Sequence, residues 1–211
     1  MPTATSKLIL ASQSPRRRDL LEQAGLTFTV IPSAFDEDAI EPGAPDDFVR
    51  TLARSKADDV AQSHAEHWVI GADTIVTIDD RILGKPGDPD EAREMLWQLS
   101  GHAHAVYTGY AIVCKAKSVL VCEAIKTDVQ FKTLNADEID RYIRTGEPFD
   151  KAGAYAIQGM GTFLVRNING SYTNVVGLPV CEVVEDLLRL GAVNADRRIP
   201  DDLSRTKGSE L

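Results

Sequence analysis

The sequence predicts an α/β protein built around a mixed β-sheet. Two apolar strand segments, residues 7–11 and 27–31, are separated by one helical segment, as expected of parallel neighbours. Residues 106–114 and 119–131 instead flank a short polar link, which is typical of an antiparallel hairpin. Parallel and antiparallel pairs in one chain indicate a mixed sheet with helices on its faces.

The N-terminal half contains clear signals for the start and end of its elements. The expected strands are 7–11, 27–31, 68–78 and 82–83, the expected helices are 15–25 and 46–65, and the expected loop is 33–45. Ser14 suits an N-cap and Pro15 the first position of a helix. The second helix is predicted because Val49, Leu52 and Val60 share one face.

The C-terminal half contains similar signals for the start and end of its elements. The expected helices are 89–101, 136–146 and 179–190, and the expected strands are 106–114, 119–131 and 162–168. Asp88 with Glu91, and Asn135 with Glu138, have the spacing of capping boxes. Asn169-Gly170 indicates a turn. We expect one domain over residues 1–193 and a flexible polar tail over 194–211.

Charge and composition exclude several classes of protein. The net charge is −9, which argues against a nucleic-acid binder but leaves room for a small anionic ligand at a local cluster of cations. The sequence has no apolar run long enough to span a membrane, and residues 1–7 lack the apolar core of a signal peptide. Three cysteines without CxxC spacing indicate unpaired thiols, so we expect a cytoplasmic protein.

The first candidate binding segment lies between a strand and a helix. Ser12, Ser14, Arg16 and Arg17 surround an expected helix N-terminus. Free N–H groups at such an end attract anions, and arginine donors match phosphate oxygens. On the residues alone, a capped helix with exposed arginines is the commoner outcome and a phosphate site the alternative.

Lys56 and Asp73 are charged residues in apolar surroundings. Lys56 falls within the apolar face of its helix, where it must either extend to solvent, the commoner case, or meet an anion. Asp73 interrupts an apolar strand, where a carboxylate is costly unless it is paired or binds a metal. A structural hydrogen bond and a general base are equally good interpretations of Asp73.

Weaker candidates complete the set. Lys85 stands between Gly84 and Pro86, Glu37 belongs to an acidic run that could ligate a metal, and Gln158 has an amide that could recognise a base. Each has a simpler interpretation as a turn, a solvated surface or a plain loop. The four histidines lack the spacing of a zinc site.

Taken together, these motifs resemble the Maf family. The resemblance is carried by LASQSPRR at 10–17, GADTIV at 71–76, GKP at 84–86, LSG at 99–101, DKAGAYAIQG at 150–159 and GSYTNVVGLP at 170–179. It implies an elongated mixed sheet with two lobes and a cleft between them, as in inosine-triphosphatase-like enzymes. It also implies a nucleoside triphosphate pyrophosphatase that needs a divalent cation, Mg²⁺ or Mn²⁺. His102 departs from the arginine common in the family.

The resemblance also implies roles for individual residues. Asp73 matches the catalytic proton acceptor and metal ligand, and Glu37 a second metal ligand. Lys56 joins the catalytic set. The substrate-binding positions are Ser12, Arg16, Arg17, Lys85, Thr74 and Gln158, of which Arg16, Thr74 and Gln158 are linked with base preference.

The form of the loop at 155–159 resembles the branch that acts on dTTP and UTP. The alternatives are the same chemistry on 7-methyl-GTP, and a nucleotide-sensing regulator of septum formation without turnover. The expected partner is a small nucleotide, with no nucleic acid and no membrane. The sequence leaves open whether the chain is a homodimer.

Overall fold

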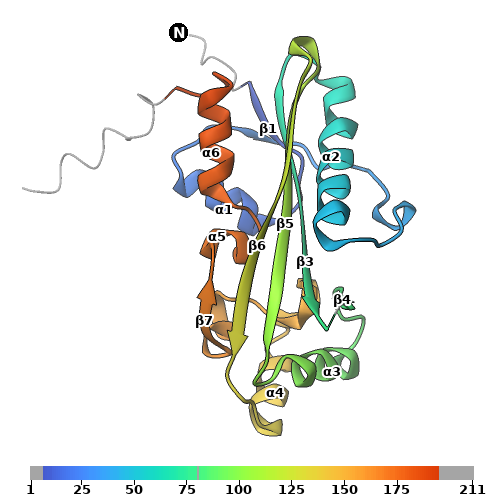
Figure 1. Cartoon of the computed structure of the whole chain (residues 1–211), viewed down its shortest axis with the longest axis vertical. Coiled ribbons are helices and arrows are strands. Elements are labelled where there is room, and N and C mark those ends of the chain that lie inside the picture. The colour runs from blue at the N-terminus through green and yellow to red at the C-terminus, as the bar shows by residue number, and fades with distance from the viewer. Residues whose placement is uncertain (1–6, 80, 195–211) are drawn as a thin grey trace, which may run out of the picture.

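A mixed β-sheet forms the centre of the molecule (Figure 1). The sheet has seven strands. The structure is a computed structural model that describes residues 7–79 and 81–194. Its strands are β1 (Leu8–Leu10), β2 (Thr29–Val30), β3 (Trp68–Ile78), β4 (Arg81–Leu83), β5 (Ala103–Cys114), β6 (Val119–Phe131) and β7 (Val165–Asn169). Its helices are α1 (Pro15–Gln23), α2 (Pro45–Ser63), α3 (Pro89–Leu99), α4 (Ala136–Ile143), α5 (Tyr172–Val176) and α6 (Val180–Arg189). The predicted α/β class is confirmed.

The strand order is β2-β1-β3-β5-β6-β7, with β4 paired to β3. β1 runs parallel to β2 and β3, whereas β3, β5, β6 and β7 form successive antiparallel pairs. The hairpin of β5 and β6 turns through residues 115–118. Both kinds of pairing are therefore present, as the sequence predicted.

Among the described residues, no strand pairs with the middle of one edge of β3. β1 pairs with β3 only as far as Leu10 opposite Ile70, and β4 begins to pair only at Val76 opposite Leu83. The stretch 71–75 of β3 therefore lies between the end of one partner strand and the start of another. Asp73 and Thr74 belong to this stretch, and their side chains leave opposite faces of the sheet.

Helices cover the two faces of the sheet at one end of the molecule. α2 packs on the face that carries Ile9 and Val69, and α1 and α6 pack on the face that carries Leu10 and Ile70. A separate core lies toward the other end of the long strands, where α3 and α4 surround residues such as Phe131. These cores give the elongated sheet two lobes, as expected.

Two glycines allow α2 to lie unusually close to the sheet. A Cβ placed on Gly71 would be 2.2 Å from the Ala53 carbonyl oxygen, and one on Gly109 would be 2.2 Å from that of Val49. Both positions lie on the α2 face, and Gly109 pairs directly with Asp73. Glycine at these points brings the helix backbone against the strands and so sets the distance from α2 to β3.

Several boundaries differ from the sequence prediction. The expected strand 162–168 is wrong at its start, because residues 159–163 form a 3₁₀ turn and β7 begins at Val165. The short helix α5 was not predicted, since the Gly, Ser and Asn around it favour a turn. The Asn135–Glu138 capping box is confirmed, whereas Glu91 accepts a hydrogen bond from Gly87 instead of from its N-cap residue.

The expected tail, 194–211, lies outside the described residues except for Asn194. None of the helices in the described ranges has the length and apolar character required to cross a membrane.

Candidate active site

A cavity of about 910 Å³ opens beside the unpaired stretch of β3. Its walls come from the N-terminus of α1, the loop before α2, α2 itself, the turn after β4, and residues 150–155 of the second lobe. The cavity therefore lies between the two lobes. With the exception of Gln158, every site residue expected from the sequence lines it.

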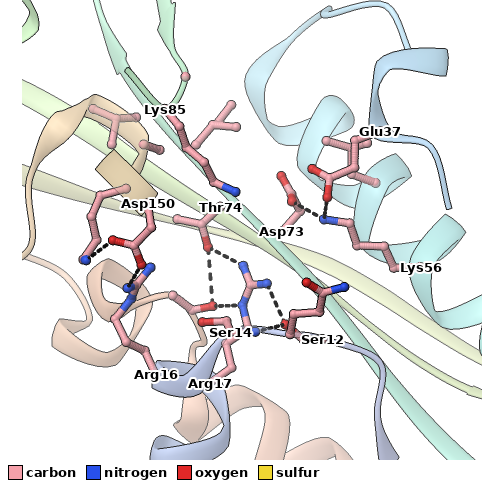
Figure 2. A pocket seen from close by; sticks show the side chains of 18 of the residues that line it. Ser12, Ser14, Arg16, Arg17, Glu37, Lys56, Asp73, Thr74, Lys85 and Asp150 are labelled. Carbon is pink, nitrogen blue, oxygen red and sulfur yellow. Dashed lines mark hydrogen bonds and ion pairs between the residues drawn. The ribbon is translucent and has the colours of Figure 1, made fainter. Parts of the chain in front are cut away.

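Lys56 bridges two carboxylates in the cavity wall, as Figure 2 shows. Its ammonium nitrogen lies 2.6 Å from Asp73 Oδ1 and 2.8 Å from Glu37 Oε1. The side chains of Lys56 and Asp73 are each only 11% exposed, whereas that of Glu37 is 54% exposed. Of the two interpretations of Lys56, contact with an anion is confirmed and extension to solvent is wrong.

A buried ion pair is seldom retained for stability alone, because removing two charges from water costs most of what their attraction returns. The pair of Lys56 and Asp73 faces a cavity large enough for a nucleotide. These observations favour a functional role for the pair.

The loop that carries Glu37 is fastened to α2. Asp59 Oδ2 accepts hydrogen bonds from the hydroxyl of Ser33 and the amide of Ala34, each at 2.8 Å. The loop then enters a 3₁₀ turn over Glu37–Ala39, whose N-terminus is capped by Asp36. Asp59 thus places Glu37 near Lys56 across a loop that the sequence showed only as polar.

The N-terminus of α1 faces the cavity without a side-chain cap in the described structure. Ser14 occupies the N-cap position, as expected, but its hydroxyl caps no backbone amide of the helix. Ser12 Oγ accepts instead from the Ser14 amide at 3.2 Å. The amides at the start of α1 therefore remain directed at a possible anion, in the manner of known phosphate sites.

Arg17 is buried and holds its neighbours in place. Its guanidinium donates to the Gly177 carbonyl at 2.7 Å, to Ser12 Oγ at 3.2 Å and to Thr74 Oγ1 at 3.0 Å. Burial lowers the pKa of Arg17, while the nearby charge of Asp73 acts in the opposite direction. Thr74 also bonds Thr108 Oγ1 at 2.9 Å, so its hydroxyl is already occupied by protein partners.

Two cations of the cavity, Lys85 and Arg16, are more exposed than Lys56. Lys85 points into the cavity in Figure 2, and its ammonium has no hydrogen bond or ion pair within the described ranges. Arg16 donates to Asp150 Oδ2 at 3.0 Å, and Lys151 contacts the other oxygen of that carboxylate. Partial burial alone would raise the pKa of Asp150, but the hydrogen bonds from Lys151 and Arg16 outweigh it and lower this pKa.

Gln158 lies beside a second, small cavity of about 20 Å³. This space shares Arg16, Lys151 and Val176 with the large cavity, so Gln158 is adjacent to the main site instead of lining it. The side-chain amide of Gln158 has no hydrogen-bond partner in the part of the chain that the structure describes. The amide is therefore available to a ligand.

Sequence reasoning missed Asp150, Lys151 and Tyr155 as cavity residues. All three lie in the segment 150–159, whose resemblance to the family could have drawn attention to them. Of the histidines in this region, His104 lies in β5, whereas His102 precedes the strand, which begins at Ala103. The buried His104 ring bonds the Tyr155 hydroxyl at 2.8 Å, and burial lowers its pKa to about 4.

The sequence matches the model of the Maf-like protein family over residues 7–190. The chain belongs to the Maf family. The match extends over both lobes and every wall of the cavity, so the family relationship covers the whole candidate site and not just one motif.

Three relatives that are about 50% identical to this chain share the same name. A protein of Geotalea uraniireducens is 50% identical over 92% of this chain and 100% of its own length. One of Geobacter metallireducens is 53% identical over 89% of this chain and 98% of its own, and one of Bacillus cereus is 51% identical over 86% and 94%. Each of the three is named dTTP/UTP pyrophosphatase.

Proposed function

We propose that this chain hydrolyses dTTP and UTP to the nucleoside monophosphate and pyrophosphate in the cavity beside β3. The observation that carries the proposal is the Lys56 bridge between Asp73 and Glu37, placed opposite an uncapped helix N-terminus and the free ammonium of Lys85. The names of the Maf relatives support the same substrates. The three cysteines are free thiols, which accords with the cytoplasmic location that we also propose.

The residues present fit a divalent cation. Asp73 and Glu37 already direct an oxygen each at one cationic point, now held by Lys56. The described residues contain no cluster of three or more His, Cys, Asp or Glu side chains that could hold a metal by themselves. Mg²⁺ characteristically uses one or two carboxylates together with water and substrate phosphates, so two protein ligands are sufficient. When bound, the cation would supply charge neutralisation at the phosphoryl oxygens.

Asp73 is the proposed proton acceptor. A water oxygen attacks the α-phosphorus, its proton passes to the Asp73 carboxylate, and the bond from the α-phosphorus to the bridging oxygen breaks to release pyrophosphate. Lys56 holds Asp73 in place and offers its positive charge to the phosphates. Its short contact with Asp73 keeps that carboxylate at one position on the unpaired stretch of β3.

The remaining cations suit the other phosphates. The amides at the start of α1, together with Arg16 and Lys85, can surround an anion from two walls of the cavity. Arg17 and Thr74 bind protein groups on most sides, so we assign them to holding Ser12 and the α1 terminus in place. Gln158, next to Arg16, would bind the pyrimidine base.

The test is a product analysis of dTTP and UTP incubated with the purified chain and Mg²⁺ or Mn²⁺. Anion-exchange chromatography should show dTMP or UMP with pyrophosphate in equal amounts. The appearance of dTDP with free phosphate would contradict cleavage at the α-phosphorus. Binding without any product would favour the alternative of a septation regulator, and preferential cleavage of 7-methyl-GTP would move the chain to the other substrate branch.

A further inference from the structure

Glu147 gathers the loop on both sides of Gln158. Its carboxylate accepts from the Met160 amide at 2.9 Å through Oε2, and from the Gly161 amide at 3.0 Å and the Tyr142 hydroxyl at 2.8 Å through Oε1. Tyr142 in turn accepts a hydrogen bond from the Ala156 amide at 3.0 Å. One carboxylate and one phenol thus fix backbone groups two residues before Gln158 and two residues after it.

Two glycines of this loop leave no room for a side chain, Gly159 beside the Glu147 carboxylate and Gly161 beside the Tyr142 hydroxyl. Gly159 has a φ of +67°, and a Cβ there would lie 2.4 Å from Glu147 Oε2. A Cβ on Gly161 would lie 2.2 Å from the Ala156 carbonyl oxygen and 2.8 Å from the Tyr142 hydroxyl. The loop therefore closes directly onto the pair of Glu147 and Tyr142, and its shape depends on them.

Glu147 has no part in the phosphate chemistry. It does not line the large cavity, and its carboxylate accepts hydrogen bonds from two backbone amides of the loop and from the Tyr142 hydroxyl of α4. Its own backbone is fastened as well, because its amide donates to Thr145 Oγ1 at 3.1 Å and its carbonyl accepts from Lys151 Nζ at 3.1 Å. Lys151 lines both cavities, so this anchor lies immediately behind the wall where Gln158 meets the site.

We propose that Glu147 is a positioning residue for base specificity, which holds the Gln158 backbone so that its amide meets the pyrimidine in one orientation. Uracil and thymine offer an acceptor and a donor where cytosine offers a donor and an acceptor, so a fixed amide discriminates between them. If the backbone at Gln158 can shift, the side chain can bring either its oxygen or its nitrogen to the same atom of the base and so accept either base. Loss of the anchor should therefore reduce discrimination more than turnover.

The experiment compares kcat/KM for UTP and CTP in Glu147→Gln, Gln158→Ala and the double variant. Glu147→Gln keeps the side-chain size but replaces an acceptor oxygen with an amide donor facing a backbone N–H. The UTP/CTP ratio should fall about tenfold in either single variant, the low end for loss of a polar contact. In the double variant it should fall no further, because both changes remove the same discrimination. kcat for saturating UTP should stay within roughly threefold of wild type in Glu147→Gln, since the phosphate-binding groups are unchanged.

Two further variants keep the test decisive. Tyr142→Phe removes the hydroxyl between Glu147 and Ala156 and should reproduce the lower ratio if Glu147→Gln does not fold. Glu94→Gln is the matched control, because Glu94 is exposed on α3 and its side chain makes no hydrogen bond or ion pair within the described ranges. Its ratio and melting temperature should equal those of wild type.

This inference rests on the proposed function, in which Gln158 binds the pyrimidine base. The outcomes therefore distinguish failure of the Glu147 role from failure of base recognition by Gln158. A changed ratio in Gln158→Ala with an unchanged ratio in both Glu147→Gln and Tyr142→Phe overturns the role of Glu147 alone. The role of Glu147 is also overturned if Glu147→Gln lowers the UTP/CTP ratio by the same factor in the wild type and in Gln158→Ala. The effect of Glu147 would then not act through the Gln158 amide. An unchanged ratio in Gln158→Ala overturns both ideas.

Discussion

Gly109→Ala tests whether the close approach of α2 to the sheet sets the geometry of the site. The new methyl carbon would lie 2.2 Å from the Val49 carbonyl oxygen and 2.8 Å from the Arg50 amide, both of them backbone atoms of α2. The distance to the Val49 oxygen is roughly 1.2 Å shorter than ordinary contact between non-bonded atoms. Backbone cannot turn aside as a flexible side chain can, so the helix must move away from β5.

The expected cost has two parts. Overpacking of this kind destabilises a core by about 1–3 kcal/mol. For a chain of this length each kcal/mol lowers the melting temperature by roughly 2–4 °C. The same movement separates Lys56 from Asp73, which pairs with Gly109 and lies 2.6 Å from the Lys56 ammonium. A misplacement near 1 Å in a catalytic site can cost about 10²-fold in rate.

The assay measures melting temperature by circular dichroism and kcat for dTTP at a temperature where every variant is folded. Gly43→Ala is the matched control, because a Cβ there would meet no atom of the described residues within 4 Å. We expect wild-type values for the control, and for Gly109→Ala a lower melting temperature and a turnover that is smaller by one to two orders of magnitude. Wild-type stability and turnover in Gly109→Ala would refute the idea that the close approach of α2 at Gly109 sets the distance between Lys56 and Asp73.

Three other predictions concern titratable side chains. Asp73→Asn should lose at least ~10²-fold in kcat with an unchanged circular dichroism spectrum, because it removes the proton acceptor and keeps the shape; near-normal turnover would make Asp73 structural. Lys56→Met should bind Mn²⁺ at least ~10-fold more tightly in the absence of nucleotide, because the ammonium between the two carboxylates repels a cation; equal or weaker binding by electron paramagnetic resonance would contradict this. Because burial lowers the pKa of His104 from 6.5 to about 4, the stability that depends on its neutral form is complete above 6.5 and lost as the pH falls toward 4. Urea unfolding should therefore show wild type losing about 2 kcal/mol more than His104→Gln between pH 7 and pH 5, and parallel losses would refute it.

The sequence by itself determined the class of fold, the family and most of the elements. Apolar periodicity and capping residues are local properties, so they located α2, β3 and the β5–β6 hairpin closely. They also exposed Lys56 and Asp73 as charges in apolar surroundings, since a buried charge needs a partner. The same local signals failed for α5, where the surrounding Gly, Ser and Asn favour a turn, and for the start of β7, where Thr162 and Phe163 suit a strand but belong to a 3₁₀ turn.

Only the tertiary structure decided how these residues meet. Residues Lys56 and Asp73 belong to different elements, and their contact depends on two glycines that admit the α2 backbone to the sheet. The cavity exists because β1 stops pairing with β3 before β4 begins, a property of strand lengths and register that no local pattern records. The contacts of Asp150 with Arg16, and of Glu147 with residues 160 and 161, likewise join segments distant in the chain or across a turn. Such contacts follow from topology, because hydrophobic periodicity reports which face of an element is buried and not which element buries it.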